Sequence, residues 1–234
     1  MKKISPEPFS ADTTPPVRGF LHRPDSAVTD GLVLTHGAGS NANSPMLVGL
    51  ASAFADAGFI VLRCDLPYRQ KKSFGPPRNS EEDRSGLAHA VAALRRLVPG
   101  RLFLGGQSYG GRQATMLAAE QPGLVDGLFI FSYPLHPPGK PNQMRTEHLP
   151  KLRTPILFVH GSDDPFATEE ELRSALKLIP APTSQLEIPG AGHDLYGRGK
   201  KVRSDLPSLL LAKFREFFQQ HMKTAVLKPP GSTF

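Results

Sequence analysis

The feature that most constrains the fold of this chain is a glycine-flanked serine that directly follows a short apolar run. Residues 102–104 are apolar, and the next residues place Ser108 between Gly106 and Gly110. This order is typical of a strand that turns sharply into a helix and exposes one hydroxyl at the bend. Side chains at positions 106 and 110 would collide in such a turn, so glycine is expected there. A glycine-rich loop with an ordinary serine gives the same pattern, so the choice between these two interpretations depends on other segments of the chain.

Short apolar runs recur along the chain, with helical patterns between them. Because these runs are apolar on both faces, they fit a parallel sheet that is covered by helices. Successive runs begin 27 to 42 residues apart, which is the spacing of repeated βα units rather than of hairpins. We therefore expect an α/β fold with a mostly parallel, doubly wound sheet and strands at Gly31–Thr35, Phe59–Arg63, Arg101–Leu104, Leu128–Phe131, Ile156–Val159 and Gln185–Ile188.

The remaining segments predict flanking helices and a single domain over residues 26–223. A capping serine, Ser80, with an acidic first turn predicts one helix start. About two dozen residues separate Phe131 from the next strand, which leaves room for a loop and a short helix but for no lid domain. Residues 1–25 form an extension with edge strands around Val17–His22, and residues 224–234 form a flexible tail. Helices are expected at Met46–Ala57, Glu81–Leu97, Tyr109–Glu120, Glu169–Leu178 and Leu206–His221.

Composition excludes several functional classes. In 234 residues there is one cysteine, Cys64, so we expect no internal disulfide and no cysteine-based metal site. No apolar run approaches 18 residues and the basic start lacks an apolar core behind it, so neither a membrane span nor a secretory signal is expected. The net charge is +7, but the basic residues are scattered and no nucleic-acid motif accompanies them. A cytoplasmic protein with no metal, cofactor, membrane or nucleic-acid partner is predicted; the oligomeric state is left open.

An acid for catalysis is expected after the strand at 156–159. A serine hydroxyl needs a base to take its proton, and the base needs an acid to fix its tautomer. In this topology the three follow the order serine, acid, histidine, each at the carboxyl end of a strand. The candidates are Asp163 and Asp164, and we favour Asp164, which lies 56 residues past Ser108 in a loop shaped by Pro165. The other aspartate is expected to be a helix cap or a solvated charge.

The base is expected in the loop after the last strand. His193 lies there, 29 residues past Asp164. Gly190 and Gly192 are expected to let this loop approach the serine turn closely. A lone histidine in a glycine-rich loop is more often inert, but this one occurs at the expected place and in the expected order.

Backbone amides for a developing oxyanion are expected on two segments. Residues 36–41 follow the expected strand at 31–35 and form a turn of small residues whose amides can point toward Ser108. We expect Ala38 to supply one donor, with Gly39 as the alternative, and the amide of Tyr109 to supply the other. His36 is expected to be structural, with its ring bonded to nearby backbone.

These segments together resemble the α/β-hydrolase superfamily, and within it the small dienelactone-hydrolase-like type. The chain also resembles bacterial relatives of the hydrolase-like domains of eukaryotic chromatin (histone acetyltransferase) complex subunits. The resemblance implies the α/β-hydrolase fold and a hydrolytic triad of Ser108, Asp164 and His193. Dienelactone hydrolases use a cysteine nucleophile, so the serine here argues against that activity. The narrower match covers residues 32–223 and rests on Thr35–Gly39, Leu62–Tyr68, Gly105–Arg112 and Tyr133–Pro141.

Several further polar residues should lie at the edge of the sheet where the strands end. His136 either touches substrate or braces the proline-rich loop. Arg69 and Arg78 belong to a basic stretch that either favours an acidic substrate or is ordinary solvated charge. Arg112, one turn into the helix after Ser108, is expected to make an ion pair.

The expected function is therefore that of a serine hydrolase acting through an acyl-enzyme on a small carboxylic ester or thioester, which carries a good leaving group. A triad that is present but misaligned would instead indicate a binding module that has lost turnover. A small peptidase is a second alternative, although it would normally need a cap to select peptides.

Overall fold

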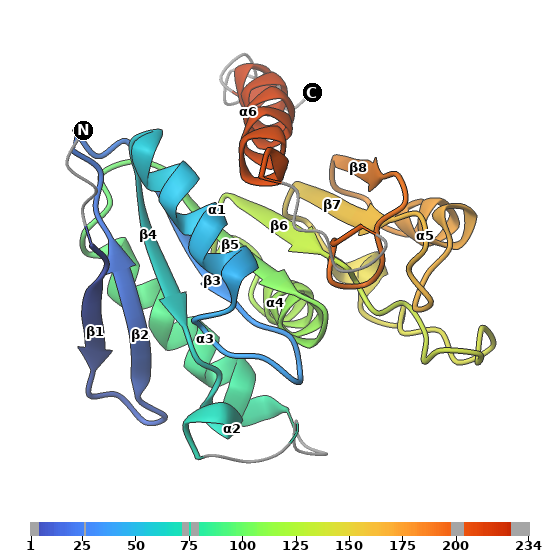
Figure 1. Cartoon of the computed structure of the whole chain (residues 1–234), viewed down its shortest axis with the longest axis horizontal. Helices are drawn as coiled ribbons and strands as arrows, with labels where there is room; N and C mark the ends of the chain where they lie inside the picture. The colour runs from blue at the N-terminus through green and yellow to red at the C-terminus, as the bar shows by residue number, and fades with distance from the viewer. Residues whose placement is uncertain (1–4, 26, 72–74, 76–79, 198–203, 226–234) are drawn as a thin grey trace, which may run out of the picture.

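One eight-stranded sheet forms the centre of the molecule in the computed structural model, which describes residues 5–25, 27–71, 75, 80–197 and 204–225 (Figure 1). The strands lie in the order β1-β2-β4-β3-β5-β6-β7-β8. Their bounds are β1 (Glu7–Ala11), β2 (Val17–His22), β3 (Asp30–Thr35), β4 (Phe59–Cys64), β5 (Leu102–Gln107), β6 (Gly127–Phe131), β7 (Ile156–Gly161) and β8 (Thr183–Ile188).

The pairing of the strands confirms the expected mostly parallel, doubly wound sheet. The strands β3 to β8 pair in parallel throughout, and only β2 runs antiparallel to both of its neighbours, β1 and β4. The order reverses beside β3, which lies between β4 and β5. Both antiparallel strands come from the proline-rich N-terminal segment, where edge strands were expected.

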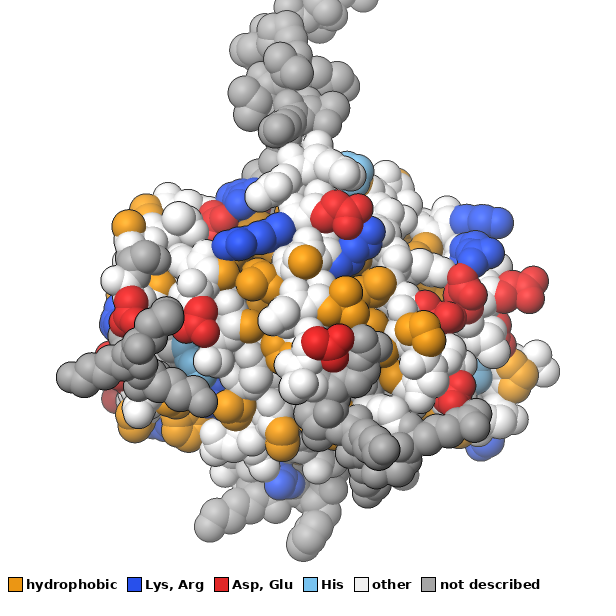
Figure 2. Space-filling view, turned by 45° about the horizontal axis from the view of Figure 1, so that its top comes forward, with side chains coloured by type: hydrophobic (Ala, Val, Ile, Leu, Met, Phe, Trp, Pro, Cys, Tyr) orange, Lys and Arg blue, Asp and Glu red, His pale blue; other side chains and the backbone are white. Residues whose placement is uncertain are grey.

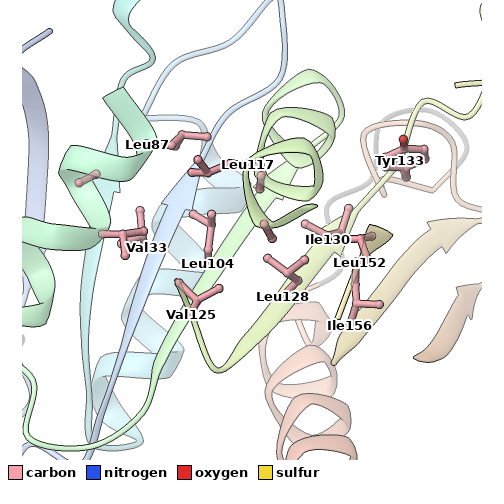
Figure 3. Close-up of a cluster of buried hydrophobic side chains, with 14 of the residues drawn as sticks. Val33, Leu87, Leu104, Leu117, Val125, Leu128, Ile130, Tyr133, Leu152 and Ile156 are labelled. Carbon is pink, nitrogen blue, oxygen red and sulfur yellow. The ribbon is translucent and has the colours of Figure 1, made fainter. Parts of the chain in front are cut away.

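Helices cover both faces of this sheet (Figure 1). Apolar residues of α1 and α6 pack on one face, and those of α3, α4 and α5 pack on the other. Figure 3 shows the second layer, where Val33, Leu104 and Leu128 of three neighbouring strands meet Leu87 and Leu117 of two helices. The helices are α1 (Pro45–Asp56), α2 (Pro67–Gln70), α3 (Glu81–Arg95), α4 (Tyr109–Glu120), α5 (Glu169–Leu176) and α6 (Leu206–Ala225).

The helix boundaries differ from the expected ones in a few places. Ser80 precedes α3, but its side chain does not cap the helix; it accepts a hydrogen bond from the guanidinium of Arg84 at 2.8 Å instead. The helix α6 continues to Ala225, into the segment expected to be a flexible tail, and residues 226–234 lie outside the described part. The connection 132–155 holds one short 3-10 helix, η1 (Leu149–Lys151), and no lid domain.

Two observations describe the helices and one face of the molecule. None of the helices in these segments combines the length and the apolar character that crossing a bilayer requires. On the face shown in Figure 2, Lys and Arg side chains lie among Asp and Glu side chains and do not form one continuous basic area.

A buried arginine ties the antiparallel strands to the parallel part of the sheet. Arg63 on β4 is 1 % exposed, and its Nε donates to Nε2 of His22 on β2 at 2.8 Å. The same guanidinium donates to the carbonyl of Ala42 and lies over the ring of Phe20. His22 must be neutral to accept this hydrogen bond. Its burial, together with the charge of Arg63, lowers the pKa of His22 from 6.5 to about 4.

We expect this histidine to make folding weaker in mild acid. Between pH 6.5 and 4 the unfolded chain binds a proton at His22 that the folded chain excludes, so stability is complete above pH 6.5 and falls as the pH falls. Urea denaturation at pH 7 and pH 5 should show a loss of about 2 kcal/mol from this residue. His22→Gln keeps an acceptor for Arg63 and should flatten that part of the pH dependence. An unchanged slope in the variant would show that His22 does not titrate this way.

Candidate active site

The carboxyl ends of the parallel strands bring four separate segments to one edge of the sheet. Thr35 at the end of β3 pairs with Gly106 of β5, and the neighbouring strands keep the same direction. The turn after β3, the serine after β5, and the loops after β7 and β8 therefore open on the same side.

Ser108 lies at a strained turn between β5 and α4. Its φ of 50° and ψ of −116° are unusual for a residue with a side chain. Its amide donates to the carbonyl of Phe131 at 2.9 Å, which continues the pairing with β6. A Cβ at Gly106 would lie 2.7 Å from backbone atoms of Gly110 and Gly111, and one at Gly110 would lie 2.4 Å from the carbonyl oxygen of His36. The two glycines thus permit both the bend and its contact with β3.

The His193 ring lies between the serine and a carboxylate. Its Nε2 is 2.8 Å from Oγ of Ser108, and its Nδ1 is 2.9 Å and 3.0 Å from the two carboxylate oxygens of Asp164. A carboxylate accepts, so Nδ1 carries the proton and Nε2 is left to accept from the serine hydroxyl. This is the tautomer that a general base for the serine requires.

Asp164 is held in place by its own loop. Its side chain is fully buried, and Oδ1 accepts a hydrogen bond from the amide of Phe166 at 2.9 Å. Asp163 beside it is exposed and accepts from the hydroxyl of Ser162, while its amide donates to the carbonyl of Ala191. Of the two candidate acids, the structure therefore places Asp164 against His193.

An aromatic ring that the sequence analysis did not single out supports the histidine. The ring of Phe166 stacks on that of His193, with centroids 4.0 Å apart and planes at 29°. Stacking leaves the two ring nitrogens free in the ring plane while it restricts rotation of the imidazole. The position of Phe166, two residues after Asp164, was the only available signal, and it did not reveal the contact.

The close approach of the acid and base loops depends on Gly161. A Cβ there would lie 2.1 Å from the carbonyl oxygen of Ala191. Gly190 and Gly192 were expected to let the base loop approach the serine turn. A Cβ at Gly190 would meet nothing within 4 Å and one at Gly192 would meet only Asp194, at 3.9 Å, so neither glycine is required by a close contact. Gly190 has a φ of 69°, a left-handed conformation that favours glycine.

Candidate oxyanion donors lie beside Ser108. The amides of Ala38, Gly39 and Tyr109 donate to no acceptor among the described residues. The turn is close to the serine, because a Cβ at Gly37 would lie 3.3 Å from Cβ of Ser108 and 4.0 Å from its Oγ. Free amides on both sides of a nucleophile are what the negatively charged oxygen of a tetrahedral intermediate requires.

His36 and Tyr68 fix the direction of the amides in this turn. The Nδ1 of His36 donates to the carbonyl of Gly37 at 2.8 Å, because Nε2 already accepts from the amide of Leu66 at 3.1 Å. The Tyr68 hydroxyl donates to the carbonyl of Ala38 at 2.7 Å. In a planar trans peptide the N–H points opposite to the C=O, so holding these two carbonyls orients the amides of Ala38 and Gly39. His36 is thus structural, and its burial lowers its pKa.

The other polar residues singled out in the sequence occupy varied positions. Both ring nitrogens of His136 lie close to protein acceptors, the carbonyl of Pro137 at 2.8 Å and Glu171 at 3.2 Å, and the residue is 5 % exposed, which fits bracing of the loop. Burial lowers the pKa of His36 and raises that of Tyr68 to about 12; the charge of Arg69, on α2, adds to the first shift and opposes the second, so Arg69 lies near both residues. Arg78 lies outside the described residues.

Arg112 does not make the ion pair that its position suggested. Its Nε is buried and has no hydrogen-bond partner, and no carboxylate of a described residue pairs with it. Burial, together with the charge of Arg112, lowers the pKa values of Arg145 and His148, so these two side chains lie near Arg112.

Two other kinds of catalytic group to consider in the described segments are a reactive cysteine and a metal-binding cluster. Cys64 is buried, and burial raises the pKa of its thiol to about 12, so the thiolate that reacts is disfavoured. No group of three metal-ligating side chains occurs among the residues that the structure describes.

Comparison with known proteins identifies the fold. A family model of the alpha/beta hydrolase domain matches residues 28–217. An alpha-beta serine hydrolase homologue from Coxiella burnetii is 20 % identical, with a TM-score of 0.70 over 90 % of this chain and 98 % of that one. An a/b serine hydrolase without lid from Xanthomonas campestris is 18 % identical, with a TM-score of 0.72 over 91 % and 94 %. A dienelactone hydrolase from Anabaena variabilis is 20 % identical, with a TM-score of 0.65 over 93 % and 99 %.

At these identities the structural likeness shows the fold alone, and the family model carries the assignment. It spans most of the chain and includes the serine turn and both loops that approach it. This chain belongs to the alpha/beta hydrolase domain family.

Proposed function

We propose that this protein is a serine hydrolase that cleaves a small carboxylic ester or thioester. The observation that carries the proposal is the continuous line from Oγ of Ser108 through the His193 ring to the buried Asp164 carboxylate, with each contact between 2.8 and 3.0 Å. The hydrolase family and the lidless neighbour support hydrolysis in general.

The proposed reaction begins when Oγ of Ser108 attacks the carbonyl carbon and its proton moves to Nε2 of His193. Asp164 stabilises the imidazolium that forms. The carbonyl oxygen becomes an oxyanion, which accepts from the amides of Tyr109 and Ala38, or of Gly39 in place of Ala38. As the tetrahedral intermediate collapses, His193 returns the proton to the leaving alcohol or thiol. Water, activated by the same imidazole, then attacks the acyl-enzyme and releases the acid.

The substrate class follows from what surrounds the serine. The segment between β6 and β7, where a lid would be inserted, holds only a loop and the short helix η1. The site is therefore open, which suits a small substrate or an exposed acyl group. Peptide hydrolysis would normally require a cap to select an extended chain, so an ester or thioester is the better fit. The reaction as proposed requires no metal or cofactor.

A binding module that retains the fold without turnover is the alternative from another class. The resemblance to hydrolase-like domains of chromatin-complex subunits suggests it. That alternative predicts misaligned side chains, whereas the hydrogen-bonding distances at Ser108, His193 and Asp164 favour an active site.

A fluorophosphonate probe separates the two functions. We expect the folded wild-type protein to be labelled covalently, and Ser108→Ala to abolish labelling, because the probe reacts only with an activated serine. In-gel detection followed by peptide mapping measures this. A folded wild type that is never labelled would favour the binding module.

The two adjacent aspartates provide a matched control. Asp164→Asn should reduce the rate of labelling by the fluorophosphonate probe about 10³- to 10⁴-fold, because the neutral amide no longer holds the histidine in the required tautomer. Asp163→Asn changes the same type of group one residue away on the exposed side and should label like the wild type. Equal losses in both variants would contradict the assigned acid.

We also propose that the site prefers anionic substrates. Arg69 pairs with no carboxylate of a described residue, and its charge acts on His36 and Tyr68, which hold the turn of candidate oxyanion donors, so it retains charge for a ligand there. Hydrolysis of matched neutral and carboxylate-bearing esters should give a higher kcat/KM for the anion, by about tenfold, that declines as salt is added. Arg69→Gln should reduce the difference. No preference for the anion would defeat this proposal.

A further inference from the structure

A buried carboxylate outside the candidate triad contacts both Tyr68 and Tyr109. Asp83, in the first turn of α3, is 1 % exposed. Its Oδ1 accepts a hydrogen bond from the amide of Tyr68 at 3.1 Å, and its Oδ2 accepts one from the hydroxyl of Tyr109 at 2.7 Å. Burial raises the pKa of this carboxyl. No step of the proposed reaction uses it.

Its setting differs from that of the adjacent acidic residue. Glu82 is exposed and forms an ion pair with Lys71. Asp83 has no cationic partner among the residues that the structure describes. A buried carboxylate without a cation opposes folding, because its loss of hydration is offset only by its hydrogen bonds. A residue that merely filled the space between α3 and the sheet would be better served by an apolar side chain.

Both partners of Asp83 belong to segments that orient candidate oxyanion donors. The amide of Tyr109 is one of these donors, and the side chain of the same residue reaches Asp83. Tyr68 does not contact the substrate in the proposed reaction. Its hydroxyl donates a hydrogen bond to the carbonyl of Ala38 at 2.7 Å and lies 3.4 Å from the carbonyl oxygen of Gly37. The rings of the two tyrosines also meet edge to face, with centroids 5.8 Å apart.

We propose that Asp83 is a positioning residue that aligns the two halves of the oxyanion hole with each other. One half is the first turn of α4, anchored through the Tyr109 side chain; the other is the turn 37–39, anchored through Tyr68. A single carboxylate receives one hydrogen bond from each anchor, so it fixes the distance between them. This role rests on the proposed hydrolase function, since only a developing oxyanion would use both sets of amides.

The decisive variants remove or preserve these contacts. Asp83→Leu is of similar size and removes both hydrogen bonds, whereas Asp83→Asn keeps an acceptor for the Tyr68 amide and offers an N–H to the Tyr109 oxygen. Tyr68→Phe removes only the hydroxyl contacts with the carbonyls of Ala38 and Gly37. Ala90→Gly weakens the same helix seven residues beyond Asp83, and Glu82→Gln changes the neighbouring exposed acid; both serve as controls.

With a p-nitrophenyl ester, Asp83→Leu and Tyr68→Phe should each lower kcat about 10- to 100-fold while KM changes by less than about threefold, because misplaced donors cost rate rather than substrate binding. Asp83→Asn should recover most of the loss. The Asp83→Leu/Tyr68→Phe double variant should lose much less than the product of the single losses, because both changes break one chain of contacts. Ala90→Gly and Glu82→Gln should keep the wild-type kcat per folded molecule.

Hydrogen exchange supplies a readout that does not depend on turnover. The amide of Ser40 donates to the carbonyl of Gly37, and that of Arg112 to the carbonyl of Ser108. Asp83→Leu should speed exchange at both, and Ala90→Gly should not. If the wild type neither hydrolyses esters nor reacts with the fluorophosphonate probe, the proposed function fails. Hydrogen exchange alone then tests whether Asp83 connects the turn 37–39 to the first turn of α4. Unchanged exchange in Asp83→Leu, or in an active enzyme an unchanged kcat, would overturn the positioning role.

Discussion

The parallel alignment of β3, β5, β7 and β8 is the constraint on which the rest of the site depends. Because these strands run in one direction, the four segments that follow them open at the same edge, although Ser108 and His193 alone are 85 residues apart along the chain. The helices packed on both faces keep the strands in register, so the distance between Ser108 and His193 is set by the core rather than by the loops alone. The loops then have to extend only a short distance from the sheet to bring their side chains together. Glycine at 106, 110 and 161 permits the close backbone contacts that this requires.

Much of this arrangement could be predicted from the sequence, because the patterns involved are local. Apolar runs at βα spacing indicated the sheet, and a serine between glycines directly after such a run indicated the turn. The candidate acid and base each followed a later strand in the order that the topology requires. Asp164 could be preferred over Asp163 because a loop shaped by the next proline turns adjacent side chains in different directions; the structure places Asp164 inward and fully buried.

What the sequence did not reveal are contacts between side chains that meet only in three dimensions. The stacking of Phe166 on His193 and the hydrogen bonds from Tyr68 and Tyr109 to Asp83 leave no periodic or spaced pattern. Ser80 had the signature of a helix cap, yet its hydroxyl accepts from Arg84, because a guanidinium from the next turn reaches it. Arg112 was expected to pair with a carboxylate, but its Nε is buried without a hydrogen-bond partner near Arg145 and His148, which no local pattern could indicate.

The proposed reaction requires that Ser108 becomes transiently acylated. The most direct test is to mix the folded protein with an excess of an activated ester, quench within seconds, and determine by mass spectrometry which peptide carries the acyl group. The account predicts one acyl group on the peptide containing Ser108, which disappears as the ester is consumed and is absent from Ser108→Ala. Acylation at another residue, or none on a folded protein with an intact Ser108, would contradict it.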